Sequence, residues 1–329
     1  MAEPPSPPVG VRPRRFFLGM ALALTLAAGW ELTWRAKGFV PSVSNSNGLW
    51  SVWRAAASKD PRVVALVGSS RLQAAMDLDV LERHFPGREL IQLSVNSGHL
   101  LGMLRDFAED PTFHGTLVVE VLPADLFTSD ATATNMWVEK YHARAPLDGV
   151  ETSVRTWFSS RLVSLLPELG MASIPHFALE RHRAPPLPYY RMDARRQLRM
   201  NFALADLAET KRFFADALRN YGTVASDAEM AARLTQLQAW VAAITARGGH
   251  VIFFRMLATQ AVLAVEEERF PDARYWALIQ KTFPSLSFQD FPAMQAFACP
   301  DGTHIDGHDA TPFTELFAQA LSALKLLKN

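Results

Sequence analysis

The chain has 329 residues, of which 49% are hydrophobic and 20% charged, so it can bury a large core and is globular rather than disordered. Its 33 basic and 33 acidic side chains leave no net charge, which excludes the strongly basic domain that nucleic-acid binding requires. Cys299 is the single cysteine, so no disulfide forms within the chain, and we interpret it as a small buried hydrophobic residue.

The N-terminus predicts a membrane anchor. Arg12, Arg14 and Arg15 precede a long apolar run. Residues 16–34 make about 28 Å of helix at ~1.5 Å per residue, which is enough to cross a hydrocarbon core. Arginines on the N-terminal side predict that residues 1–15 are a cytoplasmic tail.

Trp30 and Trp34 suit the far interface of such a membrane span. The alternative is a cleaved signal peptide, because Ala27-Ala28-Gly29 offers small residues for cleavage. In both cases the rest of the chain lies outside the cytoplasm. We therefore expect a single-pass protein of the inner (cytoplasmic) membrane, with its C-terminal domain in the periplasm or outside the cell.

An α/β domain is predicted for residues 61–329, joined to the anchor by a connector at 35–60. Val63–Val67 is a continuous apolar run of strand length, as expected of a parallel strand covered on both faces. Alternating helices and strands with short links then predict a parallel sheet with right-handed crossovers. The next elements are a helix at 71–85, a strand at 89–95, a helix at 98–109 and a strand at 116–122.

Residues 127–226 interrupt this alternation and are interpreted as an insertion that caps the site. Its basic stretch, residues 191–200, predicts a helix with a solvated face, and contact with phospholipid headgroups is the alternative. A second helix is predicted at 201–220.

The α/β alternation returns after the insertion. The sequence predicts helices at 228–247, at 266–282 with an interruption at Pro271, and at 311–327, and strands at 250–255 and 285–288. The run Glu266-Glu267-Glu268 predicts a solvated helix start. The expected architecture is three-layer α/β/α with a mostly parallel sheet.

Two separated stretches carry the chemistry of a serine-dependent site. Ser70 follows the first strand, where ligands gather in open parallel sheets. Asp301 and His304 lie in the loop before the last helix. A serine becomes a good nucleophile when a base takes its proton and a third group orients that base. The alternative for Ser70 alone is an ordinary helix N-cap.

From residue 62 onward the chain resembles the SGNH (GDSL) hydrolase superfamily. Gly68-Ser69-Ser70 is similar to the family's Gly-Asp-Ser block, so the resemblance implies that Ser70 is the nucleophile, with Ser69 in place of the aspartate. Asp301-Gly302-Thr303-His304 matches the Asp-x-x-His block, which implies His304 as the base and Asp301 as its orienter. The implied sheet is flavodoxin-like.

The middle blocks of the resemblance depart from the family pattern. The backbone N–H groups of Ser70 and Ser94 are the implied oxyanion donors, with Asn96 as a possible helper. Ala124 occupies the position of the family's oxyanion-hole asparagine. Losing one such donor typically costs ~3–4 kcal/mol of transition-state stabilisation, so simple esterase activity is in doubt.

The anchor together with these blocks resembles membrane-anchored SGNH proteins of bacterial envelopes that are linked to polysaccharide O-acetylation. This implies a serine acyltransferase or esterase acting on an envelope or secreted polysaccharide, beside a membrane-bound O-acyltransferase. Two alternatives remain: a catalytically inactive binding or scaffold subunit of a polysaccharide assembly complex, and a lipid-directed hydrolase.

Other charged residues admit two interpretations. Arg71 and Arg255 are predicted either to bind substrate or to pair with an acid, such as Asp77 for Arg71. A cluster after the triad resembles a metal site, but no further His or Cys completes it, so we expect neither a metal nor another cofactor. The cluster consists of His304, Asp306, His308 and Asp309.

Overall fold

The computed structural model describes residues 13–96, 98, 100–169 and 185–327, and the chain divides into two compact units. The first unit comprises residues 1–42 and 161–187, and the second comprises residues 43–160 and 188–329. In the described part of the chain, one helix is long and apolar enough to span a membrane: Arg14–Ala36, which contains an 18-residue window of mean hydropathy 1.5 in which no residue is buried. This confirms the length and composition of the predicted anchor.

The first unit joins the end of this helix, α1 (Pro13–Ala36), to two short 3₁₀ turns, η1 (Val163–Leu165) and η2 (Pro167–Leu169). The Glu31 carboxylate accepts the backbone N–H groups of Val163 and Ser164, both at 2.9 Å. The Arg35 guanidinium donates to the carbonyl of Arg161. Residues 161–169 therefore belong with the anchor, although the sequence placed them in an insertion that caps the site. A small apolar cluster completes the unit: Trp34, Phe39, Val163, Leu166 and Leu169.

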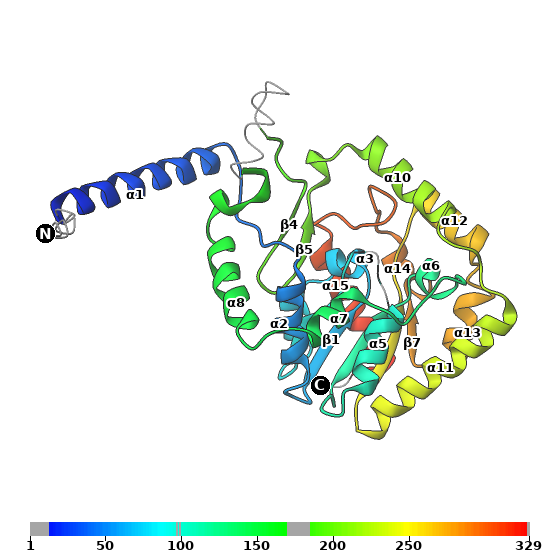
Figure 1. The fold of residues 1–329 in the computed structure, drawn as a ribbon. Coiled ribbons are helices and arrows are strands. Elements are labelled where there is room, and N and C mark those ends of the chain that lie inside the picture. The colour runs from blue at the N-terminus through cyan, green and yellow to red at the C-terminus, as the bar shows by residue number, and fades with distance from the viewer. Residues whose placement is uncertain (1–12, 97, 99, 170–184, 328–329) are drawn as a thin grey trace, which may run out of the picture. The chain divides into compact units, whose positions relative to one another are not determined.

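The second unit contains a five-stranded sheet in which all neighbouring strands are parallel, in the order β2-β1-β3-β6-β7 (Figure 1). This is the 2-1-3-4-5 order of doubly wound sheets, which bind ligands at the carboxyl ends of their first and third strands. The predicted α/β class and parallel sheet are confirmed. The strands are β1 (Val63–Val67), β2 (Glu89–Gln92), β3 (Thr116–Glu120), β6 (His250–Arg255) and β7 (Ser285–Ser287).

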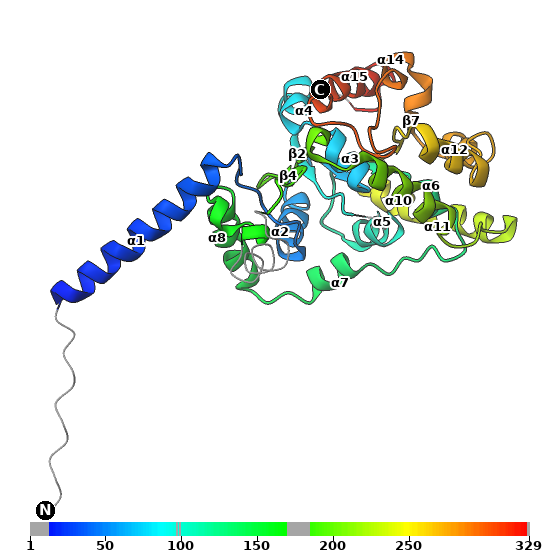
Figure 2. The ribbon, with the colours of Figure 1, turned by 90° about the horizontal axis from the view of Figure 1, so that it is seen from above.

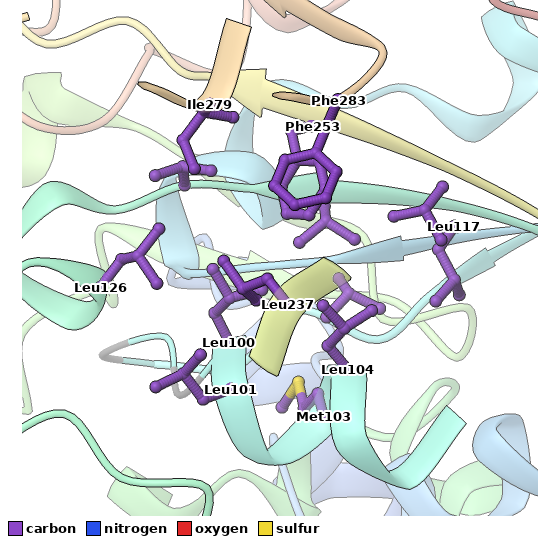
Figure 3. Close-up of a cluster of buried hydrophobic side chains, with 14 of the residues drawn as sticks. Leu100, Leu101, Met103, Leu104, Leu117, Leu126, Leu237, Phe253, Ile279 and Phe283 are labelled. Carbon is purple, nitrogen blue, oxygen red and sulfur yellow. The ribbon is translucent and has the colours of Figure 1, made fainter. Parts of the chain in front are cut away.

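Helices pack on both faces of the sheet because successive strand residues point to opposite sides. Val63, Ala65 and Val67 of β1 enter one hydrophobic cluster, whereas Val64 and Leu66 enter the other. Figure 3 shows part of the first cluster, where Leu100, Leu104 and Leu237 face strand residues such as Leu117 and Phe253. The first cluster draws on α5 (Leu100–Glu109), α11 (Asp227–Ala246) and α13 (Tyr275–Thr282), the second on α3 (Ser70–Ala75), α4 (Leu78–His84) and α15 (Ala310–Ala323) (Figure 2).

Residues 43–60 of the predicted connector are part of the second unit. Trp50 of α2 (Asn47–Ala57) is fully buried, and its indole N–H donates to the carbonyl of Leu93 at 2.8 Å. The remaining helices of this unit are α6 (Pro123–Leu126), α7 (Met136–His142), α8 (Asp148–Ser159), α10 (Leu207–Arg219), α12 (Gln260–Arg269) and α14 (Pro292–Gln295).

Several predicted helices differ in the structure. The helix expected at 71–85 breaks at Asp77, whose carboxylate accepts the N–H groups of Asp79 and Val80 and so starts α4 as a new helix. The helix expected to start at Glu266 begins at Gln260 instead, as α12. Glu266 is therefore near the end of its helix and fully buried, so the predicted solvated helix start is wrong.

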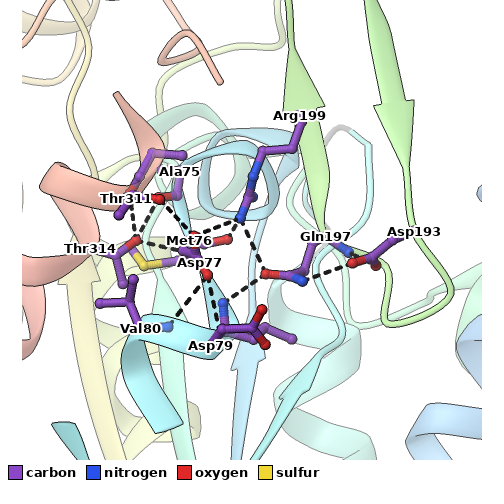
Figure 4. Close-up of polar contacts among 12 residues, drawn as sticks. Ala75, Met76, Asp77, Asp79, Val80, Asp193, Gln197, Arg199, Thr311 and Thr314 are labelled. Carbon is purple, nitrogen blue, oxygen red and sulfur yellow. Dashed lines mark hydrogen bonds and ion pairs between the residues drawn. The ribbon is translucent and has the colours of Figure 1, made fainter. Parts of the chain in front are cut away.

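The basic stretch at 191–200 was predicted to be helical but forms a hairpin of β4 (Tyr190–Met192) and β5 (Leu198–Met200). Figure 4 shows how it is held: the Arg199 guanidinium pairs with Asp77 at 3.3 Å, and the Gln197 side-chain oxygen accepts the N–H of Leu78 at 2.8 Å. Arg195 pairs with Asp79, and Arg196 is fully buried. Because these cations are bound within the protein, they do not support the headgroup alternative.

Candidate active site

Ser70 is the first residue of α3, immediately beyond the carboxyl end of β1. The residue that caps this helix is Ser69, whose hydroxyl oxygen accepts the N–H of Arg71 at 3.2 Å. The N-cap alternative for Ser70 is therefore wrong. Its hydroxyl lies 2.8 Å from Nε2 of His304.

The loop before α15 orients His304 towards Ser70. Nδ1 of His304 lies 2.8 Å from Oδ2 of Asp301, and Oδ1 of Asp301 accepts the N–H groups of Thr303 and His304 at 2.9 and 2.7 Å. Burial alone would raise the pKa of Asp301, but the hydrogen bonds and charge of His304 hold it below its usual value. A carboxylate on Nδ1 requires a proton there, which leaves Nε2 free to accept the proton of Ser70.

Ser70 and the loop that carries Asp301 and His304, far apart in sequence, thus form a continuous hydrogen-bonded chain at the switch between β1 and β3. Gly302 allows the tight loop, because its φ is +88° and a Cβ there would lie 2.7 Å from the Val262 side chain. The predicted catalytic residues are brought together in the order nucleophile, base and orienter.

Glu120, the last residue of β3, is hydrogen-bonded to the nucleophile loop. Its carboxylate accepts the backbone N–H of Ser69 at 2.6 Å and the Ser69 hydroxyl at 2.9 Å. Burial raises the pKa of Glu120, while the nearby Arg71 opposes that rise. Sequence analysis missed this residue, although an acid ending the otherwise apolar run Thr116–Glu120 was a usable signal.

We expect Gly68→Ala to displace the nucleophile loop and to lower the melting temperature of the protein. A Cβ at Gly68 would lie 2.5 Å from both Cβ and Oε2 of Glu120, and Cβ cannot swing away. The matched control is Gly149→Ala, because that helical glycine has open space around its Cβ position. Thermal unfolding of both variants checks the expectation, which equal melting temperatures would contradict.

The predicted oxyanion donors are only partly available. The Ser70 N–H, in the first turn of α3, has no acceptor among the described residues, so it can face a developing anion. The Ser94 N–H donates to the side-chain oxygen of Gln92 at 2.9 Å, which does not support its predicted role. Asn96 is exposed and follows Val95, whose N–H donates to the Gly68 carbonyl at 3.0 Å. Asn96 therefore directly follows a residue that is hydrogen-bonded to the nucleophile loop.

No side-chain donor comes from the end of β3. Ala124 is buried in α6 and offers only a methyl group, as the sequence indicated. The neighbouring Asp125 instead accepts the N–H of Leu100 at 2.7 Å, at the start of α5. The oxyanion site assembled by the described residues is thus weaker than one with a full set of donors.

Arg71 and Arg255 are buried and paired with acidic side chains. Their guanidinium groups pair with the two carboxylate oxygens of Glu266 at 2.7 and 2.9 Å, and Arg255 also pairs with Asp272 at 3.1 Å. Arg71 is 6% and Arg255 1% exposed. The pairing with an acid that the sequence allowed is present, although the acid is Glu266 rather than Asp77, and substrate binding by these arginines stays a prediction. The sequence did not indicate Glu266 as the partner of Arg71, because the two residues lie far apart in the chain.

The described part of the predicted insertion places aromatic side chains beside the triad. The ring of Phe214, in α10, meets the His304 imidazole edge-to-face at 5.3 Å between centroids. Tyr189 is close enough to Asp301 for the carboxylate charge to add to burial in raising the pKa of its phenol. One helix of the predicted insertion at 127–226 therefore contacts the base of the triad, while the role of the whole insertion as a cap stays a prediction.

The acidic and histidine cluster after the triad is not arranged as a metal site. His304 contacts Ser70 and Asp301, whereas His308 pairs with Asp306 at 2.6 Å on the surface. Within the described ranges, no three His, Cys, Asp or Glu side chains converge to hold a metal ion.

We expect Cys299 to resist thiol reagents in the folded protein. It is fully buried, and burial raises the pKa of its thiol to about 12, so almost no thiolate exists at pH 8. Iodoacetamide labelling followed by mass spectrometry should modify Cys299 only after denaturation in urea. Rapid modification of the native protein would contradict this.

Comparison with known proteins does not add to this geometry. The sequence matches no protein family model and no curated protein. The chemistry of the site is therefore argued from the hydrogen-bonded chain of Ser70, His304 and Asp301.

Proposed function

We propose that this protein is an extracytoplasmic SGNH-like serine acyltransferase or esterase with a three-layer α/β/α catalytic domain. Its reaction is O-acetyl transfer to, or removal from, an envelope or secreted polysaccharide through an acyl-serine. The observation that carries the proposal is the chain of two 2.8 Å contacts from Ser70 through His304 to Asp301. Its place beyond the carboxyl end of β1 supports a ligand site.

The proposed reaction has two balanced steps. Ser70 Oγ attacks the acyl carbonyl and gives its proton to Nε2 of His304, which passes it to the departing alcohol. An acceptor hydroxyl then attacks the acyl-serine, gives its proton to His304, and Ser70 Oγ recovers that proton as it leaves. Water as acceptor gives an esterase, and a sugar hydroxyl gives a transferase.

Two features favour transfer to a sugar over free hydrolysis. Phe214 covers one side of the His304 ring, which limits the access of water to the base. The described residues supply few oxyanion donors, so a bound acceptor or a membrane-bound O-acyltransferase partner would add the missing stabilisation. The apolar helix α1 is consistent with such a membrane-bound partner, with the catalytic unit on the periplasmic or outer side.

The proposal is tested with a fluorophosphonate probe on the full-length protein in detergent. Wild-type protein should label at Ser70, and Ser70→Ala should lose the label. Ser153→Ala, which changes an exposed serine of α8, should label as wild type does. A folded wild-type protein that never labels would count decisively against acyl-serine chemistry.

A catalytically inactive binding or scaffold subunit of a polysaccharide assembly complex is the second candidate. Ala124 and the occupied N–H of Ser94 favour it, because both remove donors from the oxyanion site. It predicts that Ser70→Ala leaves polymer modification in cells unchanged, while deletion of the whole protein abolishes it. The first candidate predicts that the two changes have the same effect.

A further inference from the structure

Helix α8 presents an apolar stripe to solvent. One side of this helix packs against α2, where the Thr152 hydroxyl lies so close to Gly48 that a Cβ there would be 2.5 Å away. No residue of α8 is buried. On the other side, four apolar residues spaced by three or four positions line up along the helix: Leu147, Val150, Val154 and Phe158, exposed by 75, 61, 53 and 45%.

Such a stripe is the mark of an interaction surface. Scattered apolar residues are normal on a protein surface, but these four share a single helix face. The polar residues of α8 lie beside or opposite the stripe, including the ion pair of Arg155 with Glu151. A helix with this division of faces is typical of one that lies in a membrane interface.

Chain continuity indicates what covers the stripe. Arg161 follows α8 almost directly, and its carbonyl accepts a hydrogen bond from Arg35, in the last turn of α1. Glu31 of α1 holds the next residues, Val163 and Ser164. Phe158 is thus three residues from a point fastened to the end of α1, which is at most about 11 Å of chain.

We propose that α8 lies in the lipid interface, with its apolar stripe at the boundary between headgroups and acyl chains. The inference rests on α1 being a membrane anchor. The anchor alone would leave the catalytic unit free to rotate, whereas a second attachment through α8 holds its orientation to the membrane surface.

The test places one environment-sensitive fluorophore on the stripe of the full-length protein. Val154→Cys is labelled with a nitrobenzoxadiazole (NBD) iodoacetamide, and the buried Cys299 stays unlabelled because of its raised pKa. The protein is reconstituted into vesicles of phosphatidylcholine and phosphatidylglycerol with or without doxyl-labelled phosphatidylcholine. The matched control is Gln238→Cys, on the exposed face of α11.

We expect the label at position 154 to lose about half of its fluorescence to doxyl lipid and to resist iodide in the water, while the label at 238 does the opposite. Equal iodide quenching at both positions would overturn the inference. Protection from iodide without doxyl quenching would also overturn it, because another protein segment or a second copy would then cover the stripe.

Flotation of the vesicles separates this inference from the anchor on which it rests. Protein that floats with vesicles but shows no doxyl quenching at position 154 retains its anchor and refutes the role of α8. Protein that does not float refutes both. Phe158→Cys supplies a second labelling position on the same stripe if Val154→Cys does not fold.

Discussion

Replacing Asp301 with asparagine is expected to lower kcat about 10⁴-fold while leaving the fold intact. The carboxylate accepts a hydrogen bond from the protonated Nδ1 of His304, and this leaves Nε2 able to accept the proton of Ser70. An asparagine amide offers its NH₂ group to Nδ1 and so favours the opposite tautomer. Nε2 then carries a proton and cannot act as the base. Hydrolysis of a small acetyl ester by wild-type and Asp301→Asn protein measures the effect.

Asp309→Asn is the matched control, because Asp309 lies five residues after His304 and contacts only the exposed His308 among the described side chains. It should keep wild-type kcat. Asparagine at 301 can still accept the N–H groups of Thr303 and His304 through its oxygen, so melting temperatures should stay close. An Asp301→Asn protein with unchanged kcat would show that His304 is not the base of the reaction.

The strands of the central sheet could be predicted because their signal is local. Val63–Val67 and residues 250–255 are apolar runs bounded by turns, and the structure confirms both strands with the predicted bounds. The helix predicted at 71–85 failed because its break depends on Asp77, whose capping role competes with the continuing apolar pattern. The helix predicted at 191–200 is a hairpin instead. Its turn residue, Arg196, has a φ of +65°, which is uncommon for a residue other than glycine and which the sequence did not indicate.

The triad could be predicted because Ser70 follows the first strand and because Asp301 and His304 lie three residues apart in the loop before the last helix. The supports of the triad could not, since each joins residues far apart in the chain. Glu120 holds Ser69 from another strand, and Glu266 holds Arg71 from a helix near the other end of the domain. A charged residue within an apolar pattern predicts a solvated face unless a buried partner is known, and the sequence does not name the partner.

Replacing Glu266 with glutamine is expected to lower the free energy of unfolding by about 3–5 kcal/mol. Glu266 is fully buried between Arg71 and Arg255, and its loss leaves two buried guanidinium groups without the carboxylate that they share. Asp272 compensates poorly, because its carboxylate pairs with Arg255 at 3.1 Å and no ion pair among the described residues joins it to Arg71. Urea denaturation of the full-length protein in detergent, followed by tryptophan fluorescence, measures the difference.

Glu268→Gln is the control, because Glu268 is exposed on the same helix, and it should change the free energy of unfolding by less than about 0.5 kcal/mol.

Burial would raise the pKa of Glu266, but the two arginines hold it below its usual value. A lowered pKa stabilises the fold above the unfolded-state pKa, about 4.3, and this contribution is lost as the pH falls through the folded-state value. The difference in the free energy of unfolding between wild type and Glu266→Gln should therefore become smaller below about pH 4. If the two proteins have the same free energy of unfolding at pH 7, the buried ion pairs are no more stabilising than neutral hydrogen bonds. A large difference would instead show that the ion pair with Glu266 stabilises Arg71, the residue that directly follows Ser70.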